Sequence, residues 1–151
     1  MKYVHTNIIS SDWKALVEFY VEVFSCKIKP PIRKQSGDWL ARGTGVPDAA
    51  LEGAHLILPG YNDDGPTLEI YQYKNTLSHI PISANTRGLG HIAFEVDDVK
   101  RVLLNIIKHG GAKEGDVITR YIDGVGELTY TYARDPDGNL IEIQSWSEID
   151  R

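Results

Sequence analysis

Apolar and polar residues alternate along residues 2–9, which is the period of a half-buried strand. After Asp12, a residue type that caps helix N-termini, the period changes to that of a helix. Apolar side chains then share one helical face at Trp13, Leu16, Val17, Tyr20, Val23 and Phe24. This helix is expected to end near Ser25, because Pro30-Pro31 cannot continue it.

The same order of elements is predicted a second time further along the chain. Extended segments follow the first helix around residues 38–43, 50–59 and 66–73, and a polar connector without a clear period follows at 74–87. A strand at about 89–96 then leads into a second amphipathic helix, which stops at Gly110-Gly111. Strands near 117–122, 128–134 and 139–146 complete the chain.

This order indicates an internal repeat of strand, helix and three strands. An offset of 86 residues sets His5 on His91, and an offset of 73 sets Glu69 on Glu142. The predicted fold is therefore α+β, built from tandem βαβββ modules. The first module spans residues 1–75, the connector 76–87 and the second module 88–151.

Composition and charge restrict the partners and the compartment. The chain has 151 residues and a formal net charge of −5 without a cluster of cations, so a nucleic-acid partner is not expected. Its single cysteine, Cys26, allows no internal disulfide and fits a reducing compartment. No signal-peptide pattern and no long apolar run is found, so a cytoplasmic protein without a membrane span is expected.

Two His and two Glu residues occupy equivalent places in the two modules. Each lies on a predicted strand among apolar neighbours that point the other way, so His5, Glu69, His91 and Glu142 are expected on the open face of the sheets. A lone strand His is more often a surface residue, but the equivalence favours a metal site. Imidazole and carboxylate ligands suit one divalent ion such as Zn, Ni, Co, Mn or Fe. His55, His79 and His109 have no counterpart and are expected to be an ordinary strand, loop and helix-end residue.

Three stretches carry the most specific pattern of the chain: His5-Thr-Asn-Ile, Leu89-Gly-His-Ile-Ala-Phe-Glu-Val-Asp-Asp-Val and Arg134-Asp-Pro-Asp-Gly-Asn-Leu-Ile-Glu-Ile. They resemble the vicinal oxygen chelate superfamily of glyoxalases, bleomycin-resistance proteins and extradiol dioxygenases. The resemblance implies that the strands curl into a cup around a metal held by His5, Glu69, His91 and Glu142. This ligand set is similar to that of bacterial glyoxalase I, whereas methylmalonyl-CoA epimerases usually have Gln in place of Glu69.

The resemblance implies a metal-dependent isomerase or lyase that moves a proton beside the carbonyl of a small substrate. The metal of such enzymes stabilises the developing enolate as a Lewis acid, and a carboxylate moves the proton. Glu142 would be both ligand and base. Glu52, seventeen residues before Glu69 on the preceding strand, is a second acid/base candidate or simply an exposed carboxylate.

The substrate is less defined by these residues. The Arg and Asn that hold glutathione in glyoxalase I correspond to Ile9 and Tyr73, so the glutathione signature is missing. Aromatic residues suggest an apolar or aromatic substrate pocket, or plain core, at Tyr71, Tyr73, Tyr132 and Trp146. The alternatives are an Fe(II) extradiol dioxygenase, against which a fourth ligand argues, and a protein that binds a small molecule or antibiotic without catalysis. A homodimer is expected whether the two modules form one cup within a chain or each pairs with its counterpart in a second chain.

Overall fold

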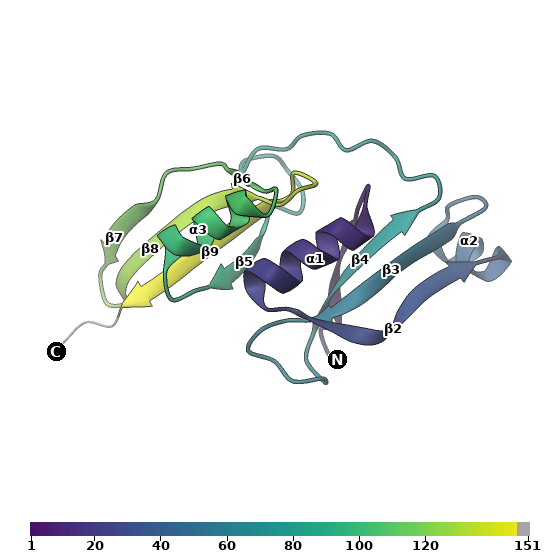
Figure 1. Ribbon diagram of the computed structural model, residues 1–151, viewed down its shortest axis with the longest axis horizontal. Coiled ribbons are helices and arrows are strands. Elements are labelled where there is room, and N and C mark those ends of the chain that lie inside the picture. The colour runs from purple at the N-terminus through teal and green to yellow at the C-terminus, as the bar shows by residue number, and fades with distance from the viewer. Residues whose placement is uncertain (148–151) are drawn as a thin grey trace. The chain divides into compact units, whose positions relative to one another are not determined.

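The structure, a computed structural model, describes residues 1–147 and contains two compact units, Met1–His79 and Ile80–Arg151. Each unit has its own mixed sheet with a helix along one face (Figure 1). The predicted α+β class is confirmed, since each unit repeats the strand, helix and strands order. The chain runs without helix or strand from Lys74 to His91.

The first unit contains a four-stranded sheet in the order β1-β4-β3-β2. Its outer strand β1 (His5–Ile9) runs parallel to β4 (Thr67–Tyr73), while β3 (Ala50–Ile57) is antiparallel to both β4 and β2 (Lys27–Ser36). The first helix, α1 (Trp13–Phe24), packs on β3 and β4. Polar side chains can project from the opposite face of the sheet.

The sequence explains both ends of α1. The Asp12 carboxylate accepts a hydrogen bond from the Ala15 N–H at 3.1 Å, and Ser25 ends the helix in the left-handed conformation at φ 57°. The predicted apolar face is buried except for the half-buried Trp13, with Phe19 added to it. The buried side chains are Leu16, Val17, Phe19, Tyr20, Val23 and Phe24.

One segment of the first unit differs from the sequence prediction. Residues 38–43, expected to be a strand, form most of the helix α2 (Asp38–Thr44), and the strand instead lies earlier, at β2. Pro30 and Pro31 end the helical pattern as predicted, and they fall in this edge strand, where the pairing register shifts between Lys29 and Arg33. A proline at such an irregularity removes no ladder hydrogen bond.

The second unit has the same order of elements as the first, but two short strands take the place of the single strand β2. Its β5 (Ile92–Glu95) runs parallel to β9 (Leu140–Ser147), and β8 (Gly126–Arg134) is antiparallel to β9. The far edge of β8 pairs with two short strands, β6 (Ala112–Lys113) and β7 (Ile118–Ile122). The helix α3 (Val99–Lys108) packs on β8 and β9, and Asp98 caps it as Asp12 caps α1.

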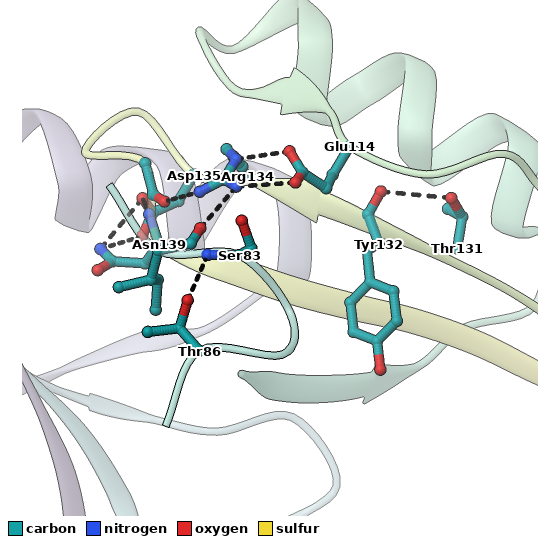
Figure 2. Close-up of polar contacts among 10 residues, drawn as sticks. Ser83, Thr86, Glu114, Thr131, Tyr132, Arg134, Asp135 and Asn139 are labelled. Atoms are coloured by element: carbon teal, nitrogen blue, oxygen red, sulfur yellow. Dashed lines mark hydrogen bonds and ion pairs between the residues drawn. The ribbon is translucent and has the colours of Figure 1, made fainter. Parts of the chain in front are cut away.

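Arg134 ties three segments of the second unit together (Figure 2). Its guanidinium pairs with the Glu114 carboxylate, and Nη1 donates to the Gly138 carbonyl at 2.8 Å. Its Nη2 also donates to the Ile82 carbonyl at 2.9 Å. The chain that enters this unit is therefore fastened to the end of β8.

No helix within residues 1–147 is long and apolar enough to cross a membrane.

Candidate functional site

Glu69 projects from β4 on the sheet face opposite α1. Its neighbours Leu68 and Ile70 are 1% and 0% exposed in the core beneath the helix, so strand alternation sends the carboxylate to the other side. The strand register places His55 of β3 directly opposite Glu69. Only 10% of the Glu69 side chain is exposed.

Two imidazoles contact the same Glu69 oxygen. His5 Nδ1 and His55 Nε2 each lie 3.2 Å from Glu69 Oε1. His55 Nε2 also lies 2.6 Å from the Tyr71 hydroxyl oxygen. The first unit thus assembles a polar cluster of His5, His55, Glu69 and Tyr71, which we call the Glu69 cluster.

Burial affects the ionisation of this cluster. It lowers the pKa of His55, and the nearby Glu69 carboxylate opposes that change. Burial, followed by the negative charge of Glu69, raises the pKa of the Tyr71 phenol. The tyrosine therefore keeps its proton at neutral pH.

The Tyr71 ring packs closely over Gly53, which has no side chain. The two residues are paired across β3 and β4, and a Cβ at position 53 would collide with Tyr71 Cδ1 and with the Ile70 carbonyl. A residue without a side chain is required at this close approach.

The second unit forms an equivalent contact around Glu142. Ile141 and Ile143 are both 0% exposed, and the carboxylate between them points away from that core. His91, which immediately precedes β5, places Nε2 2.9 Å from Glu142 Oε2. One His and one Glu of the predicted set therefore lie in contact within each unit, His5 with Glu69 and His91 with Glu142.

Tyr132 lies directly opposite Glu142 in the pairing of β8 and β9. Its ring meets the His91 ring edge to face, with centroids 5.0 Å apart and an interplanar angle of 74°. Burial and then the Glu142 charge raise the pKa of Tyr132. Tyr130 contacts the same ring at a centroid distance of 6.2 Å.

Sequence reasoning missed His55 because it looked for a histidine counterpart in the second module. The strand registers show that the counterpart is Tyr132, since each residue faces the glutamate of the neighbouring strand. The segments that join these strand pairs differ in length, Leu58–Pro66 against Asp135–Asn139, so no single offset aligns both positions. Strand alternation alone could have placed His55 on one face of β3, but not opposite Glu69.

The structure does not bring Glu52 to Glu69. Along β3, Glu52 lies on the same sheet face as Ala54 and Leu56, because alternate residues of a strand share a face. Ala54 and Leu56 are both 0% exposed in the core under α1, so Glu52 projects from the helix-bearing face. Its Oε1 pairs with Lys34 Nζ at 2.6 Å, and this bond lowers the pKa of the carboxyl. Glu52 instead lines an open pocket of about 410 Å³ beside Trp13.

The four aromatic residues predicted to line a substrate pocket differ in their surroundings. Tyr71 and Tyr73 pack against the small core of Leu40, Ala49 and Leu51. Tyr132 borders Glu142, while Trp146 lies further along β9 and is 38% exposed. Tyr132 and Trp146 share the sheet face of Glu142, because all three alternate together in the paired strands.

The donor atoms of the two pairs suit a divalent cation, since imidazole nitrogen and carboxylate oxygen are ligands of Zn, Ni, Co, Mn and Fe. Within residues 1–147, no group of three or more His, Cys, Asp or Glu side chains is arranged to hold a metal ion. Each unit therefore presents a ligand pair that fits such an ion chemically.

Comparison with known proteins gives the family. The sequence profile of the Glyoxalase/Bleomycin resistance protein/Dioxygenase superfamily matches residues 2–143. The chain belongs to this superfamily, which includes many enzymes and whose members commonly bind a divalent metal.

Similar sequences occur in distant bacteria. The uncharacterized protein YaeR of Escherichia coli (strain K12) is 24% identical over 139 residues, which is 92% of each chain. The uncharacterized protein YwbC of Bacillus subtilis (strain 168) is 28% identical over 139 residues, 92% of this chain and 93% of the relative.

Solved structures share the fold. A glyoxalase family protein from Bacillus cereus matches with a TM-score of 0.76 at 22% identity, over 98% of this chain and 94% of the other. A glyoxalase family protein from Enterococcus faecalis matches with a TM-score of 0.57 at 23% identity, over 95% and 96% of the two chains. These likenesses support the α+β fold that the sequence predicted.

Proposed function

We propose that the protein is a divalent-metal-dependent enzyme of the isomerase or lyase type, which moves a proton beside the carbonyl of a small substrate. The observation that carries this proposal is the His–Glu contact formed in each unit, at 3.2 Å for His5 and Glu69 and 2.9 Å for His91 and Glu142. These four residues would hold one ion, either within a chain or between two chains of a homodimer.

The bound ion would supply Lewis-acid stabilisation of the negative charge that develops on the substrate oxygens. Glu142 is proposed as the base: its carboxylate takes a proton from the carbon beside the carbonyl and returns one to the neighbouring carbon. The side chain is 16% exposed, which leaves it partly shielded from water and still open to a substrate.

Tyr132 and Trp146 support an apolar or aromatic substrate. Both share the open sheet face with Glu142, and Tyr130 extends the aromatic surface beside Tyr132. The raised pKa of Tyr132 keeps its hydroxyl protonated, so it can donate a hydrogen bond to a substrate oxygen.

We further propose a cytoplasmic location, because a single cysteine provides no internal disulfide and fits a reducing compartment.

Metal content tests the first part of the proposal. The full chain, purified without chelator, is examined by elemental analysis beside His91→Ala and the matched control His79→Ala, whose residue is exposed in the chain after β4. We expect a stoichiometric divalent ion in the wild type and His79→Ala, and a loss in His91→Ala. Absence of such an ion under every loading condition contradicts the metal proposal.

A substrate screen tests the reaction. Each loaded metal is combined with hemithioacetals, acyl-CoA thioesters and catechols. Proton transfer or isomerisation supports the proposal. Oxygen uptake on catechols with Fe(II) would indicate an extradiol dioxygenase instead, and tight binding without turnover would indicate a small-molecule or antibiotic-binding protein.

A further inference from the structure

We infer that His55 is a positioning residue that fixes the Glu69 carboxylate for metal binding, with Tyr71 holding the imidazole in place. This inference rests on the proposed metal site and extends it to a residue outside the four proposed ligands. It follows from the strand register and the polar contacts of the Glu69 cluster.

The backbone determines where His55 lies. β3 and β4 pair so that His55 faces Glu69 directly, and Tyr71 stands two residues further along β4 on the same side. The His55 side chain is 18% exposed, and its ring meets the Tyr71 ring with centroids 5.8 Å apart.

His55 Nε2 lies close to two oxygens. It forms a hydrogen bond with the Tyr71 hydroxyl at 2.6 Å, and it lies 3.2 Å from Glu69 Oε1. An ionised carboxylate can only accept, so an Nε2 that carries hydrogen makes a favourable contact with Glu69. Tyr71 thus holds the imidazole edge beside the Glu69 carboxylate.

The comparison of the two units argues against His55 as a ligand. His55 is the residue of β3 that faces Glu69, and the second unit has no histidine at the matching position. In the second unit Tyr132 occupies the equivalent position opposite Glu142. We therefore expect a residue at this position to orient the glutamate from the adjacent strand.

Hydrogen bonds that orient a metal ligand typically contribute 10–100-fold to metal affinity. We test this with Co²⁺ as the probe, added to chelator-treated full-length protein and followed by visible absorption, which also reports the coordination geometry. The variants are His55→Ala and His55→Gln, whose amide N–H can replace Nε2–H. His79→Ala is the control, and the melting temperature of each metal-free variant reports its folding.

The inference expects His55→Ala to bind Co²⁺ about 10–100-fold more weakly than wild type, with an unchanged absorption band. His55→Gln should recover much of the affinity, and His79→Ala should match wild type. Tyr71→Phe should weaken binding less than His55→Ala, because it removes only the support of the imidazole.

Three results would overturn it. Unchanged affinity in a folded His55→Ala shows that Glu69 needs no such support, while the metal site itself stands. An altered absorption band in His55→Ala makes His55 a ligand. No Co²⁺ binding by the wild type removes the proposed metal site and the inference together.

Discussion

Arg134 and Glu114 form a two-pronged ion pair, with Nε to Oε2 at 2.6 Å and Nη2 to Oε1 at 2.8 Å (Figure 2). The paired geometry matches a planar guanidinium to a planar carboxylate. Because Arg134 also donates to two backbone carbonyls, one side chain connects β8, the segment before β7 and the chain near Ile82.

Arg134→Lys should destabilise the protein although the charge is kept. A lysine ammonium cannot reproduce the fork, and hydrogen bonds to charged groups contribute about 1.5–3 kcal/mol each. We expect a loss of about 2–3 kcal/mol in the free energy of unfolding, measured by urea denaturation. Arg120→Lys, at an exposed position on β7, is the control and should unfold like wild type.

The same pair predicts a pH dependence. The hydrogen bond from Arg134 holds the pKa of Glu114 below its usual value, so this contribution is present above the unfolded-state pKa and is lost as the pH falls through the folded-state pKa. Glu114→Gln should therefore show a flatter decline of unfolding free energy between neutral pH and pH ~3. A decline as steep as that of wild type would contradict the prediction.

The two helix caps allow a matched comparison between the units. Asp12 accepts from the Ala15 N–H at 3.1 Å, and Asp98 accepts from the Arg101 N–H at 3.0 Å. Replacing either aspartate by Ala should cost about 0.5–2 kcal/mol of stability, whereas Asn should preserve most of it. Urea unfolding of the four variants measures this, and Asn variants as unstable as the Ala variants would exclude capping as the cause.

Two glutamates were candidate acid/base groups, and their positions now predict opposite results. Glu142→Gln should reduce turnover by about 10²–10⁴-fold, because it removes the proposed base. Glu52→Gln should leave turnover unchanged, since Glu52 pairs with Lys34 on the helix-bearing face. Steady-state kinetics on the substrate found in the screen measures both variants, and a comparable loss in Glu52→Gln would restore Glu52 as a catalytic candidate.

The repeat made the fold class predictable, together with the placement of one His and one Glu at equivalent positions in each unit. Strand alternation puts Glu69 and Glu142 away from their apolar neighbours, and the parallel outer strand brings a histidine to each. These placements follow from a local pattern that occurs twice in the sequence, so they could be predicted without knowing the loops between the strands.

Features that depend on register or long-range packing were not predictable in this way. The helix α2 buries Leu40 against Leu51 of β3, and this tertiary contact favours a helix where the local pattern predicted a strand. The strand β2 contains two prolines, and the shift in strand pairing that accommodates them is invisible in the sequence. The role of His55 was not predicted, because only the pairing register of β3 and β4 places it opposite Glu69.

Gly53 is a position where the absence of a side chain limits which substitutions the protein can accept. No larger residue fits opposite Tyr71 without moving the phenol that contacts His55. A substitution there would therefore disturb Glu69 through two intermediates, although position 53 itself bears no functional group. Steric crowding at position 53 can therefore affect the Glu69 carboxylate, although the two residues are linked only through Tyr71 and His55.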